Sequence, residues 1–133
     1  ESPYPVIDLM PEQRGVEYKG ATMRLGTHKI YLQPNTIAFN LYKQEEIMER
    51  HRHRFEVNLD YIDVLKKNGL VFSGKSSDGR RMESLEIPDK YFFFATQFHG
   101  EFKSRPGRPA PAYRGFIQAC LDKKIVNPKP TFT

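Results

Sequence analysis

The sequence predicts an α/β fold, and three observations support that prediction. The run Tyr91–Thr96 is almost entirely apolar, which is typical of a strand buried on both faces in the middle of an α/β sheet. Apolar residues recur at helical spacing from Tyr113 to Leu121 and predict an amphipathic helix. The dipeptide Asp78-Gly79 separates two strand-like runs and indicates a hairpin.

Length and composition favour a single cytoplasmic domain. The 133 residues can bury a modest core, and ten Phe with seven Tyr argue against disorder. No apolar stretch approaches the roughly 20 residues that cross a bilayer, and no secretory signal is visible, so we expect no membrane contact. A single cysteine, Cys120, fits a reducing compartment. Because the first residue is Glu1 rather than Met, we expect the chain to be part of a longer protein.

Short elements are expected in the first forty residues. Tyr4–Leu9 predicts a short buried strand, and Met10–Gly20 predicts an exposed loop. The alternation of Ala21–Leu32 is interrupted at Gly26, which favours two strands or one bulged strand. Thr36–Leu41 follows a turn and fits either a short strand or a helical turn.

Clearer patterns mark the elements that follow. Met48–Val57 alternates strongly and predicts a strand, after which Asn58 caps a helix that ends near Gly69. The hairpin strands are expected at Leu70–Gly74 and Met82–Ile87.

His99 and Glu101 are the first candidates for chemistry. They lie two residues apart, so on an extended chain both side chains share one face, about 6.6 Å apart along the backbone. A carboxylate there can orient the imidazole, as in the last two members of a nucleophile–His–acid triad. The alternative is a histidine at a strand end beside a surface glutamate. The carboxyl end of a central strand favours the catalytic interpretation.

The second candidate is the alternating run Arg50-His51-Arg52-His53-Arg54. In a strand, period two sends the arginines to one face and the histidines to the other. Guanidinium groups on one face repel each other unless acidic groups lie among them, and Glu49, Glu56 or a substrate carboxylate could do this. The net charge of +5 keeps nucleic acid as a rival partner. No aromatic platform accompanies the basic strand, so a small anion is favoured over nucleic acid.

Two further chemistries are disfavoured. A zinc site built from His99 with His28, His51 and His53 matches no standard ligand spacing. Helical spacing buries Cys120 on the packing face among apolar neighbours, which indicates a structural residue rather than a nucleophile.

Taken together, these segments resemble the glutamine amidotransferase domain of the CTP synthase family. The resemblance runs from near residue 4 to about residue 120, through Pro5–Glu12, Thr22–Gly26, Glu49–Asn58, Gln97–His99 with Glu101-Phe102, and Ser104–Pro106. It implies the class I glutamine amidotransferase fold, in which helices flank a mixed β-sheet in a flavodoxin-like three-layer arrangement. Residues 1–124 would form the C-terminal portion of that domain, and residues 125–133 would form a tail.

The resemblance also implies a mechanism. In that family a cysteine thiolate attacks the side-chain amide of glutamine, and ammonia leaves as a glutamyl thioester forms. His99 matches the histidine that activates the cysteine and protonates the ammonia, and Glu101 matches the acid that fixes its tautomer. Arg54 matches the arginine that binds the α-carboxylate of L-glutamine, with the Phe55 backbone beside it.

Partners follow from the same resemblance. Ammonia would pass to a synthase domain of the same protein, which makes CTP from UTP with ATP and magnesium, whereas no cofactor is expected in this segment. The family also implies a homotetramer.

The sequence departs from the family in two respects. Gly100 replaces the family's proline between His99 and Glu101. The nucleophilic cysteine, the oxyanion-hole glycines and the glutamate that binds the substrate amino group precede residue 1 in the family order. We therefore expect these 133 residues to be inactive alone. The alternative is a non-catalytic amidotransferase-like module that binds a partner or a regulatory molecule.

Overall fold

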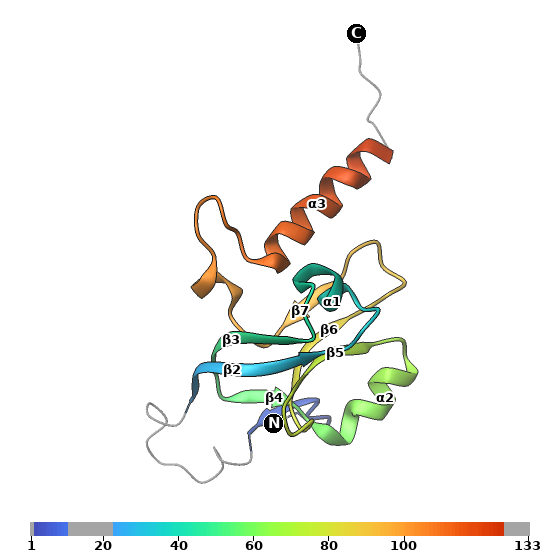
Figure 1. Cartoon of the computed structure of the whole chain (residues 1–133). Helices are drawn as coiled ribbons and strands as arrows, with labels where there is room; N and C mark the ends of the chain where they lie inside the picture. Colours follow the sequence, from blue (N-terminus) through green and yellow to red (C-terminus); the bar gives the residue numbers. More distant parts are fainter. Residues whose placement is uncertain (1, 11–22, 127–133) are drawn as a thin grey trace.

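The computed structural model describes residues 2–10 and 23–126, which are built around a five-stranded antiparallel sheet (Figure 1). Its strand order is β3-β2-β5-β6-β7, and a separate two-stranded sheet pairs β1 with β4. The strands are β1 (Ile7–Leu9), β2 (Arg24–Leu32), β3 (Glu46–His53), β4 (Phe55–Val57), β5 (Val71–Ser76), β6 (Met82–Glu86) and β7 (Phe94–Thr96). The helices are α1 (Ile37–Tyr42), α2 (Ile62–Lys67) and α3 (Pro111–Val126), with short 3₁₀ helices η2 (Leu59–Tyr61) and η3 (Gly100–Lys103).

The longest strand pairing joins β2 to β3, from Arg24 opposite His53 to Tyr31 opposite Glu46. β2 continues through Gly26, whose φ of +88° is one that glycine adopts without steric cost. The expectation of two strands or a bulge is therefore wrong for residues 24–32, and residues 21–22 lie outside the described part. Burial alternates along β3, with its histidines buried and its arginines exposed, as the period-two pattern predicts.

Two apolar clusters form the core. The first joins α1 to β2 and β3 and contains Ile30, Leu32, Ala38, Ile47 and Phe98. The second packs α2 against β4, β5 and β6 and contains Val57, Ile62, Phe72 and Met82. Phe98 belongs to the first cluster and immediately precedes His99, so the apolar core fixes the start of the candidate site.

Several local predictions are confirmed. Asn58 Oδ1 accepts a hydrogen bond from the Asp60 N–H (3.1 Å) at the start of η2, which leads into α2. Gly69, with φ of +89°, follows the end of α2. β5 and β6 form the expected hairpin, in which Asp78 accepts from the Arg80 N–H at 3.1 Å.

The segment Thr36–Leu41 is helical, because two side chains bind the first N–H groups of α1. Thr36 Oγ1 accepts from the Phe39 N–H at 3.1 Å. Glu86, buried on β6, accepts from the N–H groups of Ile37 (3.0 Å) and Ala38 (3.2 Å). These bonds satisfy donors that the helix itself leaves unpaired.

Replacing Glu86 by alanine should destabilise the fold by about 2–3 kcal/mol, because one buried and one partly buried N–H group lose charge-assisted partners. Urea unfolding of the intact protein measures this loss. Glu86→Gln keeps one acceptor oxygen and should show a smaller decrease. Equal stability of Glu86→Ala and wild type would contradict this role.

The Tyr91–Thr96 run is not the central buried strand that the sequence predicted. Only residues 94–96 form β7, which lies at the end of the strand order and pairs with β6. The Tyr91 and Phe93 side chains are exposed. Phe92 instead packs against Phe116 of α3, with ring centroids 6.2 Å apart. An apolar run alone does not distinguish a buried strand from a segment that packs on a helix.

The amphipathic helix predicted between Tyr113 and Leu121 lies within α3, but the burial of its apolar face was predicted wrongly. Phe116 and Ile117 are 54% and 56% exposed, and Cys120 is exposed as well. In Figure 1, α3 points away from the sheet. It approaches α1 on the side of Gly115, next to the Leu41 side chain, so its apolar stripe stays largely exposed apart from the contact of Phe116 with Phe92.

At the amino end, the strand predicted over Tyr4–Leu9 is present as β1 but is not buried, since Ile7 is exposed. Met10, expected to begin an exposed loop, is fully buried, and residues 11–20 of that loop lie outside the described part. In residues 2–10 and 23–126, no helix is long and apolar enough to cross a membrane.

Candidate active site

His99 and Glu101 are in direct contact. His99 Nδ1 lies 2.7 Å from Glu101 Oε1, and the Tyr113 hydroxyl donates to the second carboxylate oxygen at 3.4 Å. The contact was predicted for an extended chain, but Glu101 lies in η3, so a helical turn brings the two side chains together. The predicted partner is therefore correct and the predicted local geometry is wrong.

The contact fixes the chemistry of the imidazole. A carboxylate only accepts, so Nδ1 donates to it, and Nε2 is left as the proton-accepting nitrogen of the neutral ring. The hydrogen bond from His99 also holds the pKa of Glu101 below its ordinary value. The His99 side chain is 37% exposed, so Nε2 belongs to a ring that reaches the surface. His99 Nε2 can therefore accept and release a proton at the protein surface.

Gly100 lies between His99 and Glu101 and is buried, but the backbone conformation does not require a glycine at this position. Its φ is not positive, and a Cβ at this position would meet only the Ala110 Cβ, at 3.5 Å. The space around the turn therefore accepts a small side chain.

β3 carries the segment that contains His99. The His99 N–H donates to the carbonyl of Arg50 at 2.8 Å. The Arg50 guanidinium lies 5.2 Å from the centroid of the Phe102 ring, and the Lys103 ammonium donates to the Met48 carbonyl at 2.6 Å. Three contacts thus hold η3 and its preceding histidine against one strand.

Arg54 and Phe55 continue the same chain segment. Arg54 lies between β3 and β4 and is half-buried, and Phe55 begins β4 with an exposed side chain. Arg54 is four residues beyond Arg50, or about 13 Å along an extended backbone. β3 therefore connects the anchor of His99 with Arg54.

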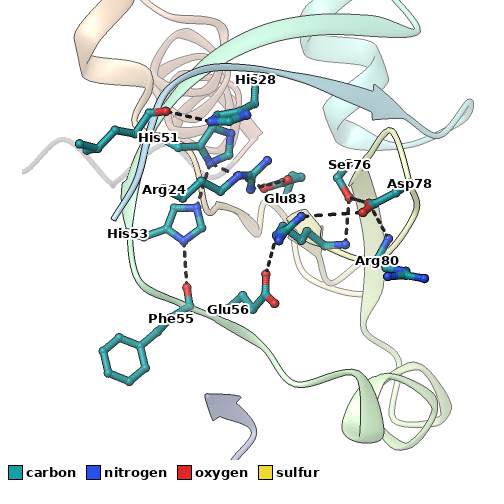
Figure 2. A network of polar contacts seen from close by, with 12 residues as sticks. Arg24, His28, His51, His53, Phe55, Glu56, Ser76, Asp78, Arg80 and Glu83 are labelled. Carbon is teal, nitrogen blue, oxygen red and sulfur yellow. Dashed lines mark hydrogen bonds and ion pairs between the residues drawn. The ribbon is translucent and has the colours of Figure 1, made fainter. Parts of the chain in front are cut away.

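A buried polar network lies beneath this strand (Figure 2). His51 Nδ1 lies 3.0 Å from His53 Nε2, and His53 Nδ1 lies 2.9 Å from the Phe55 carbonyl. Glu83 of β6 is fully buried, with Oε2 3.7 Å from His51 Nδ1 and Oε1 2.7 Å from Arg24 Nη1. The roles of Arg24 and Glu83 were missed in the sequence, because β6 also contains Ser84 and Glu86 and nothing local distinguishes Glu83.

Burial sets the protonation of this network. It lowers the pKa of His51 to about 3 and that of His53 to about 4, and the positive charge of Arg24 adds to both shifts. Both imidazoles are therefore neutral at pH 7. Burial raises the pKa of Glu83, and the Arg24 guanidinium opposes that shift.

Three side chains of the network also have the composition of a metal site. Ligand atoms of His51, His53 and Glu83 all lie within 4.8 Å of one another. The Arg24 guanidinium, however, already lies against the Glu83 carboxylate and balances its charge. The arrangement therefore resembles a buried ion pair with two neutral histidines more than a cation site.

Acid should destabilise the protein through these two histidines. An unfolded histidine binds a proton near pH 6.5, whereas His53 and His51 stay neutral down to about pH 4 and about pH 3 when folded. The unfolded state thus binds more protons below pH 6.5, and stability falls as the pH drops, by on the order of 2 kcal/mol per histidine at pH 5. Urea unfolding from pH 7.5 to pH 5 measures this change. The double variant His51→Gln/His53→Gln should show a flatter profile, and a flat wild-type profile would contradict the prediction.

A sequence model of the glutamine amidotransferase class-I family matches residues 5–119. The chain belongs to the class-I glutamine amidotransferases. Among curated relatives it is similar to the CTP synthases of Pyrococcus horikoshii (58% identity over 125 residues) and Archaeoglobus fulgidus (58% over 120 residues). These matches cover 93% and 90% of the chain but only 23% of each relative, so the chain spans about a quarter of their length.

A solved amidotransferase structure supports the fold assignment. The glutaminase domain of Trypanosoma brucei CTPS with bound acivicin superposes with a TM-score of 0.83 at 39% identity, over 92% of this chain and 48% of that one. The expected class I amidotransferase fold is therefore confirmed, and all strand pairings among the described residues are antiparallel. The boundary expected at residue 124 stays a prediction.

Proposed function

We propose that this amidotransferase chain forms part of the glutamine-hydrolysing site of a cytoplasmic CTP synthase. Its site releases ammonia from L-glutamine, and a synthase domain of the same protein uses the ammonia and ATP to convert UTP to CTP. The observation that carries the proposal is the 2.7 Å contact between His99 and Glu101 on a segment that β3 connects to Arg54. Similarity to CTP synthases over nine-tenths of the chain supports it.

In this proposal His99 moves the protons. Nε2 takes the proton of a cysteine thiol, and the resulting thiolate attacks the amide carbon of glutamine. The same nitrogen then gives its proton to the departing amide nitrogen, which leaves as ammonia while the thioester remains. Water releases glutamate from the thioester with His99 as base. Glu101 keeps Nδ1 protonated throughout, so that the reactive nitrogen stays on the accessible side.

The thiol comes from polypeptide outside these 133 residues. Cys120, the one cysteine of the sequence, lies on α3 seven residues beyond Tyr113, or about 10 Å farther along the helix axis. Tyr113 is the α3 residue that reaches Glu101, so Cys120 lies two turns past the site. We propose that the 133 residues alone hydrolyse no glutamine.

Arg54 binds the α-carboxylate of glutamine, and the Phe55 backbone lines the same subsite. A guanidinium group binds a carboxylate through two parallel hydrogen bonds, and the half-buried Arg54 carries one at the end of β3. ATP, magnesium and UTP bind to the synthase domain, no cofactor binds to this chain, and the intact protein is a homotetramer. All these assignments depend on the glutaminase role.

Arg54→Ala in the intact protein tests that role. We expect the KM for glutamine to rise roughly 10- to 100-fold, because a charge-assisted carboxylate contact is lost. CTP formation from added ammonia should not change. Arg52→Ala is the matched control, since Arg52 lies two residues away on the exposed face of β3. An unchanged KM for Arg54→Ala, or equal effects of both variants, would remove Arg54 from the site.

A further inference from the structure

The backbone at Phe55 is held on both sides by hydrogen bonds from different elements. The carbonyl of Arg54 accepts from the N–H of Met10, a fully buried residue that follows β1, at 3.0 Å. The carbonyl of Phe55 accepts from His53 Nδ1 at 2.9 Å. The two peptide groups that flank Phe55 are therefore both fixed, at the point where the chain leaves β3 and enters β4.

The ring of His53 is itself oriented from within the core. A carbonyl only accepts, so His53 Nδ1 carries the proton, and Nε2 of the neutral ring must be an acceptor. His51 Nδ1, 3.0 Å away, is then its donor. The Glu83 carboxylate, 3.7 Å from that same nitrogen and paired with Arg24, favours the proton there. Figure 2 shows this chain of contacts running from Arg24 to the Phe55 carbonyl.

We propose that His53 is a positioning residue for glutamine binding, which fixes the Phe55 carbonyl and so holds Arg54 in the orientation that receives the α-carboxylate. His51 acts one step behind it by setting the tautomer of His53. This inference depends on the glutaminase role proposed above. It gives the two buried histidines of β3 and the half-buried Arg54 that follows them a role in the same substrate subsite.

Two substitutions at residue 53 separate the two ring nitrogens. In His53→Asn, the amide nitrogen occupies the place of Nδ1 and can donate to the Phe55 carbonyl, while the contact with His51 is lost. In His53→Gln, the longer side chain places its amide oxygen near the position of Nε2 and can accept from His51, while the donor to Phe55 is lost. Both variants are neutral and polar, and they differ by one methylene group.

In the intact protein, we expect His53→Gln to raise the KM for glutamine roughly three- to tenfold, the effect of one neutral hydrogen bond. The kcat with glutamine and the rate with ammonia should stay within about twofold of wild type. His53→Asn should keep a KM within about twofold of wild type. If His53→Gln leaves KM unchanged, or if both variants lower the glutamine and ammonia rates equally, His53 has no positioning role.

The tautomers of the buried histidines can also be measured in the wild-type protein, so the inference stays testable if a variant does not fold. Nitrogen-15 NMR of labelled histidine, with His51 and His53 assigned, should show both of these imidazoles in the Nδ1–H tautomer and neutral at pH 6. Protonation at Nε2 in both buried rings would overturn the inference. Arg54→Ala separates the two proposals, because an unchanged KM in that variant defeats the glutaminase role and this inference together. A raised KM for Arg54→Ala with no rise for His53→Gln defeats the inference alone.

Discussion

Replacing His99 by alanine in the intact protein should lower glutamine-dependent CTP formation by about 10⁴-fold, the usual effect of removing one member of a catalytic triad. In the proposed mechanism, the loss of Nε2 leaves no group to activate the thiol or to protonate the departing nitrogen. CTP formation from added ammonia should stay within about twofold of wild type, because that reaction bypasses the amide. Parallel assays with saturating glutamine and with ammonium chloride measure the two rates.

Two further variants test whether the effect of His99→Ala comes from its contact with Glu101. Glu101→Gln keeps the size of the side chain but removes the charge that holds the Nδ1 proton, so it should lower the glutamine rate by about 10²- to 10⁴-fold. His28→Asn is the matched control, since the His28 ring lies 2.9 Å from the Leu25 carbonyl of its own strand and packs on the edge of the His51 ring, away from Glu101. If His99→Ala lowered the rates of CTP formation from glutamine and from ammonia equally, the histidine would support the fold rather than the chemistry.

Glu83→Ala is expected to have the largest effect on stability. It would leave the Arg24 guanidinium, only 9% exposed, without its carboxylate partner at 2.7 Å. Removing one member of a buried ion pair costs about 3–5 kcal/mol, a large share of the 5–15 kcal/mol by which domains are stable. The midpoint of thermal unfolding should fall by roughly 10 °C or more.

The double variant Arg24→Met/Glu83→Met should recover much of this loss, because neither charge then remains in the core. The ion pair between Lys29 and Glu46 supplies the surface control, since both side chains are about half exposed. Glu46→Ala should leave the midpoint unchanged within error, because exposed ion pairs contribute little. If Glu83→Ala and Glu46→Ala shift the midpoint equally, the buried network does not stabilise the fold.

The parts of the site that local sequence determines were predicted well. His99 and Glu101 are two residues apart, so they meet whether the backbone is extended or turns, although the turn itself was not foreseen. The alternation of residues 50–53 requires only that the segment be a strand with one buried face, whereas Arg54 follows the end of that strand and is half-buried. The Asn58 cap and the Asp78-Gly79 hairpin likewise depend on a few adjacent residues.

Contacts between distant residues were not predictable in this way. Arg24 and Glu83 are 59 positions apart, and no local pattern pairs them, yet they set the charge of the buried network. The apolar run before His99 has the composition of a central strand, but Phe92 packs on α3. The stripe of α3 has helical periodicity that identifies the helix and its apolar face, while burial of that face depends on what packs against it.

The central claim is that the amide nitrogen of glutamine is released at His99. Glutamine labelled with nitrogen-15 in the side-chain amide, supplied to the intact protein with UTP, ATP and magnesium, tests it most directly by mass spectrometry of the product. The label should appear in CTP with an equal amount of glutamate from the wild type, and should disappear with His99→Ala while labelled ammonium is still incorporated. Undiminished transfer of the amide label by His99→Ala would contradict the claim.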